Sequence, residues 1–156
     1  MCKHRRRKNE MIIELERLFE MAKRIWTEGA VTSDDFGFAL EVDGNTLIFF
    51  SPRESSGLIY CRAKVASLDA ETCPPDFAEA LLQGNFFWTG TRGGTLSFNE
   101  FDGMIYLTDR FDAGAFDDEE AFVRYVSDFV RTLDDWRVRR SAYIDDVSED
   151  AGKEAE

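Results

Sequence analysis

The sequence predicts an α+β fold in which helices pack on a twisted antiparallel sheet. Apolar residues recur at spacings of three and four in two long segments, which indicates amphipathic helices. In shorter segments they alternate with other residues, which indicates strands with one buried face. Turn-forming Gly, Asn, Asp and Pro separate these segments. The expected order is helix, three strands, helix, two strands, helix, within a single domain over 9–144.

The chain begins with a basic arm at 1–8, which holds five Lys and Arg residues and which we expect to be flexible. A role for this arm in binding phosphate or an acidic partner stays open. The first helix is expected over 9–28, with a second apolar stripe of Ile12, Phe19 and Trp26 beside the first. The edge of this wide apolar face either packs on the chain's own sheet or receives a partner.

Three strands are expected next, over 36–42, 46–50 and 58–65. The middle strand is apolar on both faces, so each face needs cover. The alternation places the following residues on the buried faces of the first and third strands: Phe36, Phe38, Leu40 and Val42, then Ile59, Cys61, Ala63 and Val65. Asp43, Gly44 and Asn45 form the first turn, since Gly and Asn adopt positive φ at low cost.

A short second helix is expected from Cys73 to Gly84, with Pro in its first turn. Its apolar residues reach most of the way around its axis: Phe77, Ala78, Ala80, Leu81 and Leu82. The sheet can cover only one side of such a helix, so a second subunit is expected to cover the other. This is the argument from the residues for a homodimer.

The segment after this helix contains three consecutive aromatic residues, Phe86-Phe87-Trp88, and a glycine-rich connector over 90–94 that we expect to be flexible. A hairpin with strands at 95–98 and 104–108 follows. The last helix is expected to begin with Asp117 as its N-cap. The acidic tail at 145–156 is poor in apolar residues, and we expect it to be disordered.

Composition and motifs argue against several functions. The net charge of −12 disfavours nucleic acid, whose phosphates would be repelled, and no apolar run is long enough to span a membrane. His4 is the only histidine and lies in the basic arm, so we expect no catalytic residue, no metal ligand and no cofactor. Three widely spaced cysteines without a Cys-x-x-Cys pair indicate reduced thiols in a cytoplasmic protein. An enzyme is not expected.

The order of elements, together with two segments, resembles the class I type III secretion chaperones of the Tir-chaperone family. The first segment is Leu81-Leu82-Gln83-Gly84-Asn85-Phe86-Phe87, and the second runs from Gly90 to Phe98. The strand from Gly103 to Leu107 and the last helix, up to Trp136, fit the same pattern. The resemblance covers roughly 11–140. Gly84 departs from it, because the family often has Ala there, and the basic arm and the acidic tail are additions.

The resemblance implies an acidic cytoplasmic homodimer that binds the N-terminal region of a secreted effector and keeps it soluble and competent for export. It also admits the secretion ATPase as a partner. In the family the short second helix lies at the dimer interface, which here implies Phe77 and Leu81, with Trp88 nearby. The first helix and the first three strands would bind the client. The residues expected to do so are Phe19, Trp26, Phe38, Phe49 and Tyr60.

Two alternatives remain at the level of sequence. One is a YbjN-like relative with the same topology, which would have a regulatory or stress role and no effector client. The other is a small-ligand or enzymatic domain that uses a pocket under Trp88.

Overall fold

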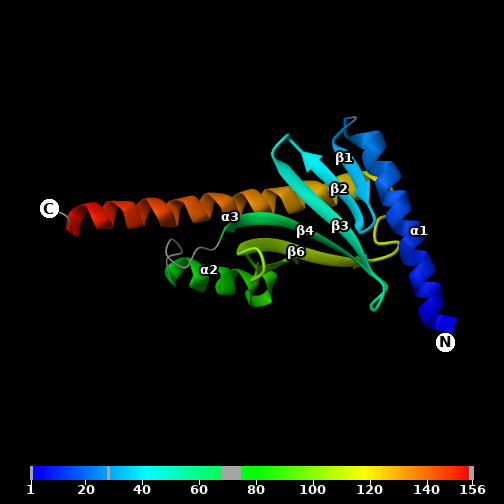
Figure 1. Ribbon diagram of the computed structural model, residues 1–156, viewed down its shortest axis with the longest axis horizontal. Coiled ribbons are helices and arrows are strands. Elements are labelled where there is room, and N and C mark those ends of the chain that lie inside the picture. Colours follow the sequence, from blue (N-terminus) through cyan, green and yellow to red (C-terminus); the bar gives the residue numbers. More distant parts are fainter. Residues whose placement is uncertain (1, 28, 68–74, 155–156) are drawn as a thin grey trace. The chain divides into compact units, whose positions relative to one another are not determined.

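A computed structural model describes residues 2–27, 29–67 and 75–154 of the chain (Figure 1). It confirms the α+β class and the antiparallel sheet, whose six strands follow the order β1-β2-β3-β4-β6-β5. The strands are β1 (Val31–Asp34), β2 (Gly37–Val42), β3 (Thr46–Arg53), β4 (Leu58–Ser67), β5 (Thr95–Asn99) and β6 (Met104–Asp112). The helices are α1 (Cys2–Ile25), α2 (Pro75–Asn85), the single 3-10 turn η1 (Phe86–Trp88) and α3 (Glu119–Glu154).

The chain divides into two compact units. The first comprises Met1–Ala63 and Thr108–Val126, and the second comprises Lys64–Leu107 and Ser127–Glu156. A single domain over 9–144 stays a prediction.

In the first unit, α1 packs on β1, β2 and β3 (Figure 1). Met11, Leu18 and Ala22, which belong to the first apolar stripe of the expected helix, are fully buried as predicted. The antiparallel register pairs Phe38 with Phe50, and their rings stack with centroids 4.7 Å apart. The expected face of β4 is correct too: Ile59, Cys61 and Ala63 in this unit are buried, and so is Val65, which belongs to the second unit.

The first unit also contains a strand that the sequence did not predict. β1 has one apolar residue, Val31, and its other three side chains are exposed, so it lacks the alternation that indicates a strand. It forms because its backbone pairs with β2 in antiparallel register. The placement of Phe36 on a buried face was wrong. Phe36 lies in the turn between β1 and β2, and its side chain is 78% exposed.

Within the described residues, 2–8 and 145–154 are helical where the sequence predicted a flexible arm and a disordered tail. α1 begins at Cys2 and takes in the basic arm, and α3 continues through the acidic tail to Glu154. The flexibility of these ends stays a prediction. The N-cap of α3 is Asp118 and not Asp117, since Asp118 Oδ1 accepts a hydrogen bond from the Ala121 N–H at 2.8 Å.

In the second unit, α2 packs on β5, and its C-terminal end is fixed by Asn85. The Asn85 side chain donates to the Leu96 carbonyl at 3.0 Å and accepts from the Leu96 N–H at 2.8 Å. This pair of bonds fixes the register between the helix end and the hairpin β5–β6, which the sequence predicted. Among the described residues Phe77, Leu133 and Trp136 are the largest fully buried side chains in this unit outside the hairpin.

Candidate functional site

The first unit carries three adjoining hollows around the β1–β2 turn and the end of β3. The α1 groove, of about 400 Å³, is lined by Ile12, Leu15, Glu16, Phe19, Ser33, Asp34, Asp35, Gly37, Phe38, Pro52 and Glu54. The turn hollow, of about 370 Å³, is lined by Asp34, Phe36, Gly37, Phe38, Phe49, Phe50, Ser51, Pro52 and Arg62. The arginine hollow, also about 370 Å³, is lined by Ser51, Pro52, Arg53, Tyr60, Cys61, Arg62 and Thr108. The three hollows adjoin because they share lining residues, and Pro52 lines all three.

The α1 groove is apolar because one helical stripe faces it. Ile12, Leu15 and Phe19 recur at spacings of three and four, so they lie on one side of α1. Ile12 is 39% exposed, and Phe19 is partly exposed. The Phe19 ring lies 5.7 Å from the ring of the buried Phe38, so the groove floor rests on the core of the unit.

Gly37 lines both the α1 groove and the turn hollow, and no other residue type fits its position. Its φ is +141°, and a Cβ there would lie 1.9 Å from the Phe50 carbonyl oxygen. The absent side chain therefore lets the start of β2 approach β3 closely. Before it, Asp34 Oδ1 accepts a hydrogen bond from the Phe36 N–H at 2.7 Å, which closes the turn and directs the Phe36 ring outward.

Two arginines stack on aromatic rings beside the arginine hollow. The Arg62 guanidinium lies 5.2 Å from the Phe49 ring centroid, and that of Arg53 lies 5.5 Å from the Tyr60 ring. Cation–π contacts of this kind hold a charge over an apolar surface while leaving it accessible. Within the described residues neither guanidinium has a carboxylate partner. This hollow therefore combines aromatic surface with positive charge.

A hydrogen-bonded set of three side chains lies beneath the arginine hollow. Tyr125 donates its hydroxyl proton to Asp109 Oδ2 at 2.9 Å, and Cys61 Sγ lies 2.9 Å from the same hydroxyl oxygen. Burial raises the pKa of the Cys61 thiol to about 12 and raises the pKa of Tyr125 as well. The thiol therefore stays protonated at neutral pH and is a poor nucleophile. The set stabilises β4, β6 and α3 within this unit and offers no reactive group.

The structure brings together four of the five residues that the sequence assigned to a binding surface. Phe19 and Phe38 line the α1 groove, Phe38 and Phe49 line the turn hollow, and Tyr60 lines the arginine hollow. Phe38 is 4% exposed, so it forms a floor and not a rim. Trp26 lines none of the three and packs edge-on against Phe122 at 6.0 Å.

Sequence reasoning missed the contribution of Phe36, Arg53 and Arg62 to these hollows. The Asp-Asp-Phe-Gly order of 34–37 is turn chemistry and could have placed Phe36 outside the strand. The two arginines carry no such signal, because their roles depend on the strand register that sets Arg62 opposite Phe49.

The second unit exposes an apolar surface of its own. We call Leu82, Phe86, Phe87 and Trp88 the aromatic cluster; all four side chains are exposed, Phe87 to 75%. Phe87 and Trp88 adopt positive φ values of 50° and 55°, a left-handed backbone that is uncommon for bulky residues. Of the predicted interface residues, Trp88 belongs to the cluster and Leu81 is partly exposed beside it. Phe77 is 2% exposed and packs inside the unit.

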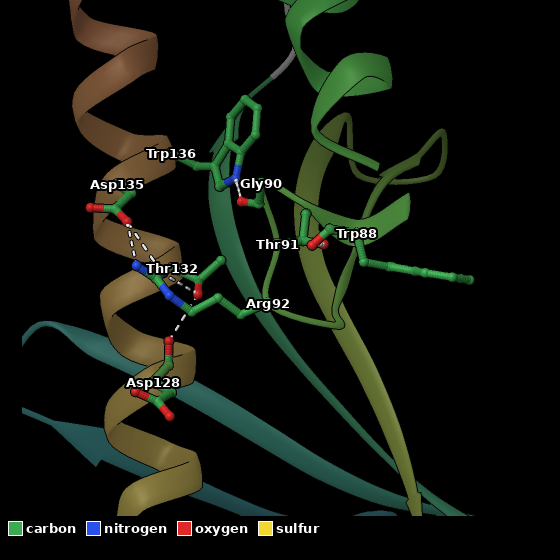
Figure 2. A network of polar contacts seen from close by, with 8 residues as sticks. All are labelled: Trp88, Gly90, Thr91, Arg92, Asp128, Thr132, Asp135 and Trp136. Carbon is green, nitrogen blue, oxygen red and sulfur yellow. Dashed lines mark hydrogen bonds and ion pairs between the residues drawn. The ribbon is translucent and has the colours of Figure 1, made fainter. Parts of the chain in front are cut away.

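Figure 2 shows how the connector after the cluster is attached to α3. The Gly90 carbonyl accepts a hydrogen bond from Trp136 Nε1 at 2.8 Å, and Arg92 donates to Thr132 Oγ1 at 2.7 Å. Arg92 also forms an ion pair with Asp135 at 3.2 Å. The connector at 90–94 is thus held at two residues, where the sequence predicted a flexible segment. Trp88 points away from α3 (Figure 2).

No group of three or more His, Cys, Asp and Glu side chains among the described residues could hold a metal ion. In the same part of the chain, none of the helices combines the length and the apolar character needed to cross a bilayer.

Comparison with known proteins identifies relatives. The model of the Tir chaperone protein (CesT) family matches residues 18–137. The fold is similar to that in the crystal structure of the ExsC–ExsE complex, with a TM-score of 0.63 and 18% identity over 79% of this chain and 90% of the other. The HopA1–SchA chaperone–effector complex gives 0.61 and 13%, over 79% and 93% of the two chains. The heterodimeric ExoU–SpcU complex from the type III secretion system of Pseudomonas aeruginosa gives 0.54 and 17%, over 72% and 85%. No curated protein matches the sequence.

Proposed function

Since this chain belongs to the Tir chaperone protein (CesT) family, we propose that it is a type III secretion chaperone that binds the N-terminal region of a secreted effector. Binding would keep the effector soluble and competent for export. The observation that carries the proposal is the set of three adjoining hollows, whose floors are aromatic and aliphatic. Family membership also favours this function over a YbjN-like regulatory role.

An extended client segment suits these hollows for a physical reason. Apolar side chains of the client, which would cause it to aggregate in water, can enter the α1 groove and the turn hollow. There they contact Phe19, Phe38 and Phe49. β1 is an edge strand, so its outer backbone groups can pair with a client in β conformation. In this proposal Tyr60 contacts the client at the arginine hollow, and Trp26, which follows α1, packs on Phe122 and has no direct role in binding.

The proposal includes a homodimer in which a second copy covers the aromatic cluster. Exposed Leu82, Phe86, Phe87 and Trp88 form an apolar surface that a second copy can bury. Leu81 and Trp88 would contact the partner, whereas Phe77 would act from inside by supporting α2. We place the dimer in the cytoplasm, without enzymatic activity of its own, and expect it to deliver its client to the secretion ATPase.

The test is recovery of the tagged protein from its native cells while secretion is switched on, followed by identification of bound proteins by mass spectrometry. We expect one dominant partner, held through its N-terminal region. The variant Phe19→Ala/Phe49→Ala should lose most of this partner. Phe101→Ala is the matched control, because Phe101 is 92% exposed in the β5–β6 turn and lines none of the hollows. Recovery of the wild-type protein alone would contradict the proposal.

A further inference from the structure

The α1 groove is apolar at its floor and acidic at its rim. The charged side chains that line it are Glu16, Asp34, Asp35 and Glu54, and no Lys or Arg is among its lining residues. Of these carboxylates Glu54 has an ion-pair partner, Lys8, at 2.9 Å. Within the described part of the chain, Glu16 and Asp35 form no ion pair. Their negative charge is therefore available to a bound segment.

A lysine close to the groove residue Phe19 is already engaged. Lys23 lies 5.1 Å from the centroid of the Phe19 ring and pairs with Glu20 at 3.2 Å. It thus leaves the carboxylates of Glu16 and Asp35 uncompensated. The arginine hollow has the opposite character, since Arg53 and Arg62 line it and no carboxylate does. The sign of the charge therefore changes across the three hollows, and the acidic rim is a local property of the α1 groove.

We propose that the α1 groove binds a client segment in which bulky apolar side chains are flanked by Lys or Arg. This inference rests on the proposed function and specifies the chemistry of the client at one of its sites. Ile12, Leu15 and Phe19 contact the apolar side chains of the segment. Glu16 and Asp35 attract its cations, and the same carboxylates repel a segment flanked by Asp or Glu.

The charge of the rim should give a binding preference for segments flanked by Lys or Arg, and this preference should be lost at high salt. Pairs at an exposed rim contribute modestly, so several together shift a dissociation constant by about tenfold. Exposed charges are screened as ionic strength rises, because the Debye length falls to a few ångströms. The apolar contribution persists at high salt.

Three synthetic peptides provide the probe. They share one pattern of Leu and Phe and differ only at the flanking positions, which are all Lys, all Gln or all Glu. Binding of each labelled peptide to the full chain is measured by fluorescence anisotropy at about 50 mM and about 500 mM salt. We expect the Lys peptide to bind about tenfold more tightly than the Glu peptide at low salt, with the Gln peptide between them and the differences largely lost at high salt.

Variants of the groove test which residues cause the preference for Lys. Glu16→Gln/Asp35→Asn should remove most of the preference for Lys, whereas Ile12→Gln should weaken the binding of all three peptides alike. The matched control, Glu41→Gln/Asp112→Asn, makes the same change of charge in the first unit with exposed residues that line none of the hollows. It should leave the preference intact.

The outcomes separate this inference from the proposed function. Equal binding of the three peptides, weakened by Ile12→Gln, would overturn the charge preference and leave the groove as a client site. A Lys preference that survives Glu16→Gln/Asp35→Asn would place the effect elsewhere and overturn the inference as well. Failure of all three peptides to bind overturns it too, and the capture of a native partner then decides the proposed function independently.

Discussion

The variant Gly84→Ala should destabilise the second unit, although alanine is the better helix former. Gly84 is buried near the end of α2, and an added Cβ would lie 2.3 Å from Trp136 Cζ2 and 2.7 Å from Cη2. Carbon atoms in contact are normally about 3.5–4.0 Å apart. The indole cannot easily retreat, because its Nε1 bonds the Gly90 carbonyl and the Arg139 guanidinium lies 4.7 Å from its ring.

The magnitude follows from two opposing effects. Overpacking of a close-packed core costs about 1–3 kcal/mol. The gain in helix propensity from Gly to Ala is at most about 1 kcal/mol and is smaller near a helix end. We therefore expect Gly84→Ala to lower the free energy of unfolding by about 1–2 kcal/mol. That is a substantial fraction of the stability of a typical domain.

A double-mutant cycle with Trp136→Phe tests the cause. Phenylalanine lacks the ring atoms that Cβ would meet, so Gly84→Ala should be nearly neutral in that background, with a coupling energy of about 1–2 kcal/mol. The assay is urea denaturation followed by circular dichroism. Gln83→Ala, which changes an exposed neighbour in α2, should show no coupling. Equal costs of Gly84→Ala in both backgrounds would refute the argument.

Two further predictions concern the interface and pH. Leu81→Ala should weaken the proposed dimer by about 1–3 kcal/mol, measured by sedimentation equilibrium. The control Leu47→Ala, at an exposed leucine of β3, should leave the dimer unchanged. An unaltered dimer of Leu81→Ala at micromolar concentration would argue against the interface. Burial raises the pKa of Cys61 from 9.0 to about 12, so the folded protein keeps a proton that the unfolded chain loses. The stability contributed by this site is full below pH 9.0 and is lost as the pH rises toward 12. The urea concentration at the unfolding midpoint should fall less steeply with rising pH in Cys61→Ala than in the wild-type protein. Identical slopes in the two proteins would exclude the thiol as the cause.

Much of the fold could be predicted because its signals are local. The alternation from Ile59 to Val65 identifies a strand and its buried face without any knowledge of its partners. β1 has no such signal, since it forms only when β2 is present to pair with it. The same limit explains why the connector was taken as flexible: its bonds to Trp136 and Thr132 join residues far apart in the sequence.

Four aromatic residues that line the hollows were named from the sequence, whereas the charged residues that line them were not. The wide apolar face of the first helix pointed to Phe19, and the family resemblance suggested Phe38, Phe49 and Tyr60. The acidic rim of the α1 groove and the cation–π contacts of Arg53 and Arg62 depend on which strands lie side by side. Such contacts depend on the tertiary structure, which a single sequence does not report.

The left-handed backbone at Phe87 and Trp88 has a consequence for the speed and entropy of association. Holding two bulky residues at φ of 50° and 55° costs of the order of 1–2 kcal/mol each, and this cost is met when the chain folds. Any partner that covers the cluster therefore meets rings whose backbone is already ordered, so less conformational freedom is lost on contact. Encounter should then resemble the docking of two rigid bodies, with little rearrangement after collision.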